Sequence, residues 1–519
     1  MKLSKSVMFG AAACLLSTSA SAQAAGDLLA LSQYNYSFST ARSAALGGAF
    51  TSLGADLSSM SINPAGLGMY MSSDFGISPS LTWNNMQSTY LGMKSDYSRT
   101  RFTLGNLGMA FNLYQGSGTL TSFTLGVGYS KLADFNTTSA AYGQGIDKSI
   151  TDVLAEYMNG VPLSSLGHPD NDPYQPFRRA DVGLWGGILA YQTGILDPMS
   201  DAQDNKQYTV ANNLATGSRI NPSMRNVNKG SIDEYSISGG FNIQNILYLG
   251  FTIGIQDILY RNDNYYAETY DNNSLPLNGM NYIRSLHLDG TGVNFKFGAV
   301  VRPIENLRIG VAVHTPTLVS INEEYIEWMS ADYKNTARGE LLDSPRSLNE
   351  YDINTPTRLL TGISYTLPGV GLITADYERV WYNRMKLRNM GTENWDFQQT
   401  INNEVSSFYQ PANNFRVGIE ATPAQNFYIR AGYANYGECI ATRDAFNNMS
   451  SINSYENYSA GLGFRFQNMY VDLAYIYTEY KYAPYTMFYY GDPDYVVNPG
   501  NVETKQSRNT ITMSVGVRF

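Results

Sequence analysis

The residue types that most often carry out catalysis are few and scattered in this chain. The three histidines stand at positions 168, 287 and 314, without the spacing of metal ligands. No Gly-x-Ser-x-Gly, His-Glu-x-x-His or phosphate-binding-loop motif occurs. The clustered carboxylates of residues 168–172 have the chemistry of a calcium site, but a solvated turn explains them better. We therefore expect no enzyme activity, no catalytic residue, no bound metal and no cofactor.

Charged side chains instead recur on one face of segments whose other face is apolar. Phe415, Val417 and Ile419 alternate with Arg416 and Glu420. Successive side chains of a β-strand point to opposite faces, so this pattern predicts a strand with one lipid-facing side and one polar side. The same period of two recurs in residues 293–302, 427–433, 458–466, 471–477 and 509–519.

The predicted inner faces carry charges that have two interpretations. An ion-pair network that satisfies itself inside a barrel is the simpler one, and contact with a ligand is the functional one. For the functional interpretation the candidates are Arg416, Arg430 and Arg465. The charged inner-face residues considered are Asp376, Glu378, Arg416, Glu420, Arg430 and Arg465.

Composition and the N-terminus indicate an exported membrane barrel. The chain has 519 residues, with 40 Tyr, 47 Gly and only 15% charged residues, and its mean hydropathy is −0.26. Transmembrane β-barrels combine such values, because only every second strand residue faces lipid. Residues 1–22 read as a secretory signal peptide, and no later run reaches the roughly 18 apolar residues of a membrane helix. The net charge of −9, without basic clusters, argues against nucleic acid as a partner.

The connections between predicted strands alternate between short and long. Six short turns and seven long stretches predict an all-β fold, a transmembrane antiparallel barrel of about fourteen strands, with the long loops outside the cell. Tyr475, Tyr477, Tyr480 and Tyr482 are predicted to form part of its aromatic girdle. The short turns are expected at 115–119, 243–245, 303–306, 368–371, 423–426 and 467–468, and the long loops near 85–99, 134–230, 271–286, 329–352, 389–410, 438–454 and 483–504.

The longest predicted loop, residues 134–230, has structure of its own. Residues 147–160 place apolar side chains at helical spacing, and residues 183–196 are strongly apolar without alternation. These two pieces either pack on each other as a cap or form an extracellular groove for an apolar ligand. In the second case Trp185, Ile188 and Leu189 are the ligand-binding candidates.

Residues 41–68 differ from everything that follows them. They are rich in Gly, Ala and Ser, carry only two charges, Arg42 and Asp56, and do not alternate. Small residues permit close packing of backbone inside a larger structure, and Asn63-Pro64 begins a tight turn. This composition predicts a plug inside the barrel.

The chain resembles the FadL/TodX family of outer-membrane transporters for hydrophobic molecules. The resemblance rests on Ala-Ala-Leu-Gly-Gly-Ala-Phe at 44–50, Leu-Gly-Ala-Asp at 53–56 and Asn-Pro-Ala at 63–65, and the final Phe519 is typical of outer-membrane barrels. It implies a signal peptide over 1–22, an N-terminal hatch over 23–72 and a barrel over 73–519. The hatch residues carried over are Gly47, Gly48, Asp56, Asn63, Pro64 and Ala65.

The resemblance also implies a function and a location. A small hydrophobic molecule, such as a long-chain fatty acid, would enter from the extracellular loops, pass a hatch that moves and leave sideways through the wall. The expected location is the outer membrane of a Gram-negative cell, with outer-membrane lipid around a monomer. No inner-face Arg or Lys matches a ligand residue of the family individually, so the substrate stays open. A transport-inactive scaffold in a secretion system, a non-selective porin and a plug that never moves are the alternatives.

Overall fold

The structure is a computed structural model. It describes residues 25–519 except 168–171, 211–218, 272–276, 335–340, 392–393, 442–451 and 493–494. The predicted signal peptide, residues 1–22, and most of the segment 168–172 therefore lie outside the described residues. None of the described helices is both long and apolar enough to cross a membrane.

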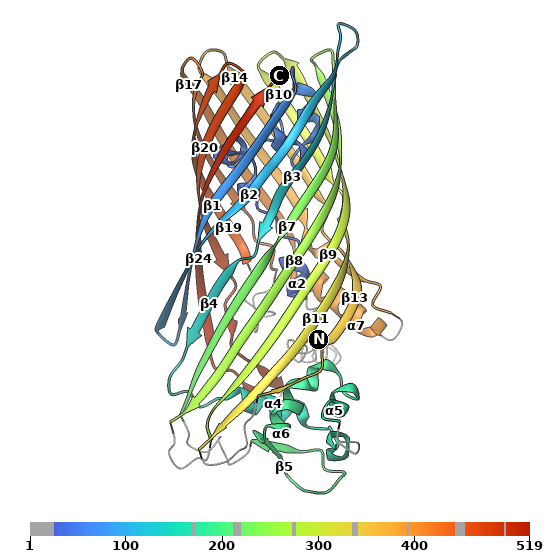
Figure 1. The fold of residues 1–519 in the computed structure, drawn as a ribbon, viewed down its shortest axis with the longest axis vertical. Coiled ribbons are helices and arrows are strands. Elements are labelled where there is room, and N and C mark those ends of the chain that lie inside the picture. Colours follow the sequence, from blue (N-terminus) through green and yellow to red (C-terminus); the bar gives the residue numbers. More distant parts are fainter. Residues whose placement is uncertain are drawn as a thin grey trace, which may run out of the picture.

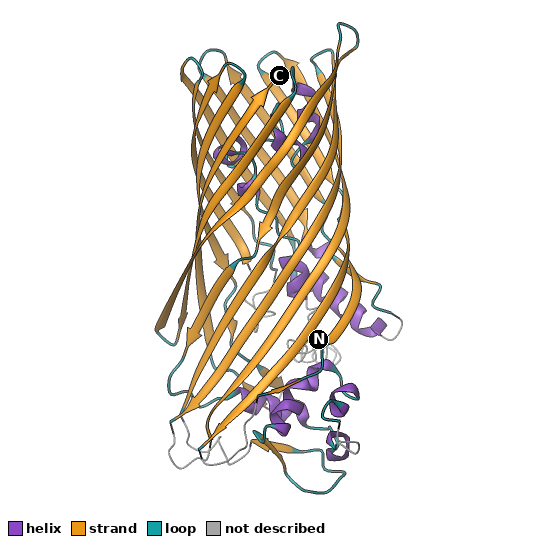
Figure 2. Ribbon diagram, viewed as in Figure 1, coloured by secondary structure: helices purple, strands orange, loops and turns teal. Residues whose placement is uncertain are grey.

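Antiparallel strands form a closed barrel (Figures 1 and 2). The first wall strand, β1 (Asp74–Tyr90), pairs with the last, β24 (Asn501–Arg518), from Asp74 opposite Arg518 to Tyr90 opposite Val502. The described residues contain fourteen wall strands, which confirms the predicted fold class. Between β1 and β24 the wall contains β2 (Met93–Gln115), β3 (Leu120–Asp134) continued by β4 (Thr137–Tyr142), β7 (Ile220–Ile243), β8 (Leu247–Tyr270), β9 (Leu277–Ile304), β10 (Leu307–His314) continued by β11 (Leu318–Tyr333), β13 (Ser347–Asn354) continued by β14 (Arg358–Leu367), β15 (Gly371–Trp381) continued by β16 (Lys386–Arg388), β17 (Pro411–Ala424), β18 (Phe427–Tyr436), β19 (Ile452–Phe466) and β20 (Met469–Tyr482).

The two faces of the wall follow the predicted period of two. On β17, Phe415, Val417 and Ile419 are exposed on the outside, whereas Arg416 and Glu420 are buried on the inside. A belt of apolar side chains on the outside is what a lipid bilayer requires of a barrel, and a polar interior is its usual counterpart. The chain is therefore an outer-membrane β-barrel.

The predicted aromatic girdle is half wrong. Tyr475 is exposed on the outer face of β20, but Tyr480 is buried and lies with Tyr482 along the inside of the barrel. The strand continues without interruption through these residues, so odd and even positions must face opposite sides. The four tyrosines cannot share one face.

One end of the barrel carries the short turns and the C-terminus, at the top of Figure 1, and the other carries the long connections. We call them the short-turn end and the long-loop end. All six predicted short turns connect neighbouring wall strands at the short-turn end. On the predicted topology this end faces the periplasm.

Several predicted long loops are wrong because the strands run further than expected. The region 85–99 is a hairpin in which Tyr90 pairs with Met93 around Leu91 and Gly92, both of which have positive φ. Strand β9, of 28 residues, begins at Leu277 and so covers much of the predicted loop 271–286. A tilted strand needs only about 9–11 residues to cross a membrane. Beyond the lipid, neither face must be apolar, so the alternation of hydrophobicity that signals a strand is lost.

The predicted loop 134–230 is shorter than expected for the same reason, since β4 and β7 leave only residues 143–219 outside the wall. This connection contains one helix in the segment 147–160, which was predicted to have helical spacing, and another in the apolar segment 183–196. The helices and short strands outside the wall and the N-terminal segment are α4 (Ile150–Met158), η4 (Leu163–Leu166), α5 (Gln175–Arg178), η5 (Val182–Leu184), α6 (Trp185–Gln192), β5 (Leu196–Pro198), β6 (Tyr208–Val210), β12 (Leu342–Asp343), η7 (Tyr382–Arg384), α7 (Trp395–Phe408), β21 (Tyr485–Thr486), β22 (Tyr490–Asp492) and β23 (Tyr495–Val497).

Residues 25–72 lie inside the barrel, and we call them the plug segment (Figure 1). They form five short turns of helix: α2 (Ala25–Ala30), η1 (Tyr36–Phe38), α3 (Ala41–Ala45), η2 (Leu57–Met60) and η3 (Pro64–Met69). Most of the segment is buried. The helix α3 contacts the wall at β18, β19, β20 and β24, and η3 contacts it at β7, β8 and β9.

Glycines on the inner face of the wall allow the plug segment to approach so closely. A Cβ atom built on Gly250 would lie 2.2 Å from the backbone carbonyl carbon of Pro64. Gly240 and Gly298 flank Gly250 in register on the neighbouring strands. Six of the wall glycines in such contacts form what we call the glycine belt: Gly240 against Leu67, Gly250 against Pro64, Gly298 against Asn63, Gly310 against Thr51, Gly418 against Leu46 and Gly432 against Gly47.

The glycine belt predicts that a single methyl group will loosen the plug segment. Gly250→Ala forces the backbone at Pro64 away from the wall, and overpacking of this kind costs about 1–3 kcal/mol. We expect a lower unfolding temperature and faster protease cleavage within residues 25–72. The measurements are heat-induced unfolding followed by gel mobility and limited proteolysis with mass spectrometry.

Gly118→Ala is the matched control, because a Cβ on Gly118 would meet no atom within 4 Å. If Gly250→Ala were as stable and as resistant to protease as Gly118→Ala, close packing at the glycine belt would not hold the plug segment.

Candidate functional site

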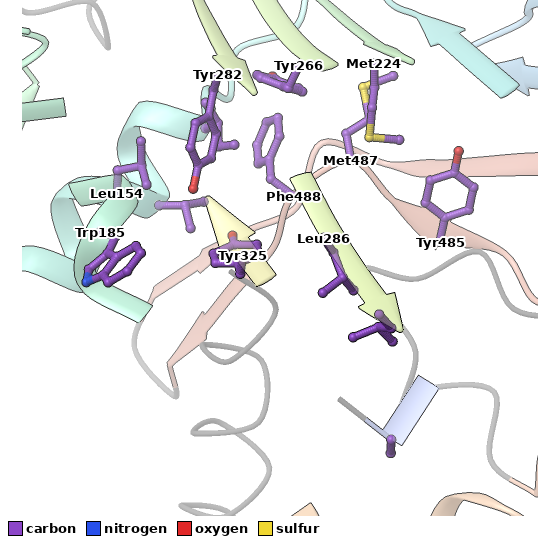
Figure 3. Packing of buried hydrophobic residues seen from close by; sticks show 14 of the residues in the cluster. Leu154, Trp185, Met224, Tyr266, Tyr282, Leu286, Tyr325, Tyr485, Met487 and Phe488 are labelled. Carbon is purple, nitrogen blue, oxygen red and sulfur yellow. The ribbon is translucent and has the colours of Figure 1, made fainter. Parts of the chain in front are cut away.

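A cavity of about 290 Å³ lies in the barrel beside the plug segment, toward the long-loop end. Its volume is at the lower end of the range for small-molecule sites. It is bounded by α2 of the plug segment, by α4 of the 143–219 connection, by residues 485–489, and by the inner faces of wall strands that include β7, β8 and β9. Figure 3 shows part of the apolar packing around it.

The covering elements contribute mainly apolar side chains to the cavity. Leu29 comes from α2, Val153 and Leu154 from α4, and Met487 and Phe488 from the segment that precedes β24. The ring of Phe488 packs edge-on against Tyr266 of the wall, with 5.8 Å between ring centroids. These side chains supply the apolar surface that a hydrophobic ligand requires.

The wall contributes a row of amides. Asn226 and Asn228 on β7 face Asn264 and Asn262 on β8, in register. Asn264 Nδ2 donates to Asn226 Oδ1 at 2.5 Å, and Asn262 Nδ2 donates to Asn228 Oδ1 at 2.6 Å. On β9, Arg284 Nη2 donates to Asn264 Oδ1 at 3.1 Å. All five side chains line the cavity, so this part of its wall is polar.

The helix α4 is fixed over the cavity by a buried carboxylate. Glu268 on β8 accepts hydrogen bonds from Ser149 Oγ at 2.5 Å and from the backbone N–H of Ile150 at 2.8 Å. It also accepts from the hydroxyls of Tyr266, at 2.6 Å, and Tyr270, at 3.0 Å. A buried carboxylate needs such a set of donors to replace water. Glu268 therefore anchors the first turn of α4 to the wall.

The same helix carries its own N-terminal cap. Ser149 Oγ accepts from the Thr151 backbone N–H, and the Asp152 side chain accepts from the Ser149 backbone N–H at 3.0 Å, which together make a capping box. Burial raises the pKa of the Asp152 carboxyl above its ordinary value, and its hydrogen bond from Ser149 opposes this change. The helix ends at Met158 with Asn159 as its C-cap, and Gly160 follows with a φ of +100°, which suits a glycine after a helix.

The apolar helix α6 packs on α4 from the side away from the cavity. Gly186 and Gly187 of α6 lie against Leu154 and Met158 of α4. This contact supports the interpretation in which the segments 147–160 and 183–196 pack on each other as a cap. Trp185, Ile188 and Leu189 are buried within it, and none of them lines the cavity.

The wall beside the cavity contains a break in its hydrogen-bonded ladder. Strand β2 pairs with β3 only over residues 106–115, and among the described residues β4 pairs with β7 but not with β2. Asp134 and Asn136 bend the chain between β3 and β4: Asp134 Oδ1 accepts from the Asn136 backbone N–H at 2.9 Å. Asn136 Nδ2 also donates to the backbone oxygen of Gly230 on β7 at 2.9 Å.

We call this break between β2 and β4 the seam. Side chains bridge it. Ser95 Oγ donates to the backbone oxygen of Ala140, and the Tyr97 and Tyr142 hydroxyls are 3.1 Å apart. A second, very small cavity of about 10 Å³ lies at the seam, and it shares Met86 with the lining of the main cavity.

The predicted arginine candidates lie elsewhere. Arg416 and Arg430 are fully buried in ion pairs, Arg416 with Glu378 at 3.4 Å and Arg430 with Glu420 at 2.6 Å. Arg465 contacts Asp472 at 3.0 Å, as does Arg430 at 2.6 Å. None of the three lines the cavity. Their geometry supports the simpler interpretation, a network that satisfies itself.

This network reaches the plug segment. Arg42 of α3 forms an ion pair with Glu420 at 3.3 Å. On β15, Asp376 Oδ2 accepts from the backbone N–H groups of Phe50 and Thr51, both at 2.8 Å. Charged groups of the wall therefore hold the plug segment as well as one another.

The predicted hatch residues all lie in the plug segment, in separate turns of it. Gly47 and Gly48 have φ of +67° and +75°, which a residue with a side chain rarely adopts. Asp56 caps η2 by accepting from the Ser58 backbone N–H at 2.9 Å.

Asn63 has the most contacts of the predicted hatch residues. Its Oδ1 accepts from the Ala65 backbone N–H at 3.1 Å and caps η3, in which Pro64 is the first residue. Its Nδ2 donates to the Thr51 backbone oxygen at 2.6 Å. The Asn-Pro-Ala motif thus joins two turns of the plug segment.

Sequence reasoning missed the amide row and Glu268, because both lie in strands that extend beyond the predicted ones. The sequence nevertheless contained a signal for this surface. Tyr260, Asn262, Asn264, Tyr266 and Glu268 occupy alternate positions, and together they place one type of surface on one face of a strand. Among the described residues, no group of three or more His, Cys, Asp or Glu side chains is arranged to hold a metal ion.

The contacts of Glu268 predict that its removal will release α4. Glu268→Ala leaves buried donors of Ser149 and Ile150 without an acceptor, which costs about 1–3 kcal/mol. We expect faster amide hydrogen exchange over residues 149–158, measured by mass spectrometry on the purified protein. Glu156→Ala on the same helix removes only a half-exposed carboxylate that accepts from Asn159 at 2.9 Å. Equal exchange in the two variants would show that Glu268 does not anchor the helix.

No protein-family model matches the sequence, and no curated protein sequence matches it significantly. Solved structures do resemble the fold. The P. putida toluene transporter TodX is 13% identical, with a TM-score of 0.52, over 94% of this chain and 99% of that one. A Pseudomonas aeruginosa FadL homologue is 11% identical, with a TM-score of 0.52, over 94% and 98%.

These structures are transport channels, and their likeness extends over almost the whole of both chains. At such low identity the comparison establishes the fold. It agrees with the resemblance found in the hatch motif and with a closed barrel whose lumen holds an N-terminal segment. The chain has the fold of the FadL/TodX-type outer-membrane transporters.

Proposed function

We propose that this barrel takes up small hydrophobic molecules across the outer membrane, with a long-chain fatty acid or a similar compound as the substrate class. The observation that carries the proposal is the largely apolar cavity between the cap and the plug segment. Such a space removes an apolar molecule from water and gives it a site inside the barrel. The names of the similar structures, a toluene transporter and a FadL homologue, support the same class of ligand.

The plug segment argues against passage straight along the barrel axis. Its backbone touches the glycine belt on several strands, and most of it is buried. A water-filled pore would in any case offer little to an apolar solute. Exit sideways into the membrane avoids both obstacles, because lipid is the environment in which a hydrophobic molecule is most stable.

The seam is the place in the wall where we propose that the ligand leaves. The cavity lining includes Asp134, Phe135 and Thr137, the residues at the bend between β3 and β4. Opening an ordinary ladder would break a row of backbone hydrogen bonds between two strands. Opening the seam breaks only side-chain contacts such as that of Ser95 with Ala140.

We further propose that the plug segment acts as a hatch that shifts when a ligand is bound. The helix α2, which contributes Leu29 to the cavity lining, belongs to the plug segment. Under this proposal the bound ligand contacts α2, which is part of the segment that moves. The hydrogen bonds of Asp376 to Phe50 and Thr51 would hold the remainder of the plug segment while α2 adjusts.

A reversible lock across the seam tests the sideways exit. Ser95→Cys/Ala140→Cys, in a Cys439→Ser background, places a disulfide where the two strands meet without a ladder. Oxidation should reduce uptake of radiolabelled oleate at least about tenfold if exit through the seam is obligatory, and dithiothreitol should restore it. The assay uses cells of a Gram-negative host that lacks its own fatty-acid channel.

Gln87→Cys/Asp96→Cys in the same background is the matched control. These residues are partners in the paired ladder of β1 and β2, so a disulfide there closes no gap. Cys439 is buried, and burial raises the pKa of its thiol to about 12, so its replacement should not alter the exposed surface. Equal uptake by the oxidised seam pair and the oxidised control pair would exclude the seam as the exit.

Deletion of residues 26–56 tests the hatch. The barrel should still fold, because the wall ladder does not include these residues, and it should show single-channel conductance that the intact protein lacks. Planar-bilayer recording measures the conductance, and heat-dependent gel mobility checks the fold. A folded deletion variant with unchanged conductance and unchanged oleate uptake would contradict the hatch and leave the scaffold interpretation.

A further inference from the structure

The amide row gives the cavity a polar wall that a plain hydrocarbon cannot use. In register, Ser139 on β4, Asn226 on β7, Asn264 on β8 and Arg284 on β9 lie side by side across four neighbouring strands. Neighbouring strands are about 4.8 Å apart, so the row extends about 14 Å across the wall. It is a continuous feature of the cavity, much longer than one polar contact.

The hydrogen bonds within the row hold the amides in place but do not use all of their donors and acceptors. Each amide has two N–H donors and an oxygen that accepts two hydrogen bonds. Asn262 uses one N–H on Asn228, and Asn228 uses one N–H on Thr137 Oγ1 at 3.2 Å. Donors and acceptors on the same groups therefore remain for a ligand. Asn226, Asn228 and Asn262 are only partly buried, in agreement with this capacity.

The free-energy cost of leaving the amides of the row without hydrogen-bond partners determines which ligands the cavity prefers. A hydrocarbon that fills the cavity strips water from the amides and offers no hydrogen bond in return. A ligand with hydroxyl, carbonyl or amide groups along one edge replaces the lost water. Its other edge meets Leu29, Val153, Leu154 and Phe488, which are apolar.

We propose that the cavity selects amphiphiles that carry hydrogen-bonding groups along one edge of an apolar skeleton, over plain hydrocarbon chains of the same length. The inference rests on the proposed uptake function and narrows its substrate class. Asn228 and Asn262 are specificity-determining residues for such ligands, together with Asn226 and Asn264.

A pair of matched fatty acids tests the proposal on the full-length protein in detergent. Stearate and 9,10-dihydroxystearate share the chain length and the carboxylate, and they differ in two hydroxyls at the middle of the chain. Displacement of tritiated stearate by each unlabelled acid measures the two dissociation constants. We expect dihydroxystearate to bind about tenfold more tightly, the factor expected for two neutral hydrogen bonds.

Asn228→Leu/Asn262→Leu removes one amide pair as a unit and leaves the Asn264–Arg284 contact in place. In this variant the preference should fall to about twofold or less, with stearate bound as tightly as before or more tightly. Met224→Leu is the matched control, because Met224 lines the same cavity on the same strand as Asn228 and has no amide. It should keep the tenfold preference.

The outcomes separate this inference from the proposed function. If stearate binds and dihydroxystearate displaces it no better than stearate itself, the selectivity is wrong and uptake of hydrophobic molecules stands. A preference that survives in the Asn228→Leu/Asn262→Leu variant would overturn the role of the amide row. If neither acid binds the intact protein, both the selectivity and the proposed function fail.

Discussion

Backbone pairing is the constraint on which this structure depends. In lipid no water is available for an N–H or C=O group, so each strand must find partners on both sides and the sheet must close on itself. The pairing of β1 with β24 achieves the closure. The seam between β2 and β4 departs from the rule, because side-chain contacts replace the ladder there. Separating β2 from β4 would therefore break side-chain contacts and no backbone ladder.

The interior follows from the closure, because a barrel of this width encloses a space that must be filled or hydrated. The plug segment fills it near the short-turn end, and the glycine belt allows backbone to contact backbone. Ion pairs then orient the plug segment, as Arg42 with Glu420 illustrates. Buried ion pairs contribute little net stability compared with apolar packing, but removal of one partner is costly. Charge on the inner wall thus specifies one arrangement of the lumen.

The cavity exists because the plug segment and the cap stop short of each other. The helix α2 bounds it on the plug side, and α4 bounds it on the side of the long connections. The position of α4 depends on Glu268, which lies on the wall and not on the cap. A cavity made from three separate parts can change its shape when any one of them moves. This is the property that uptake through a closed barrel requires.

The sequence by itself determined the barrel, because lipid imposes a period of two on every strand that faces it. The alternation of residues such as Phe415, Arg416 and Val417 predicts both the strand and its two faces. The motifs at 44–50 and 63–65 likewise predict a plug, because small residues and a Pro turn suit backbone that packs on backbone. The strand count and the fold class were predictable for these reasons.

Only the tertiary structure decided where a ligand can lie. Arg416 and Arg430 are charged inner-face residues of the kind that could bind a ligand, but Glu378 and Glu420 from other positions in the chain pair with them. Asn228 and Asn262 were missed because they lie where the strands extend beyond the lipid, and no alternation of hydrophobicity marks a strand there. The register of β7 against β8 brings these amides together. The seam arises in the same way, from a ladder that two distant segments fail to complete.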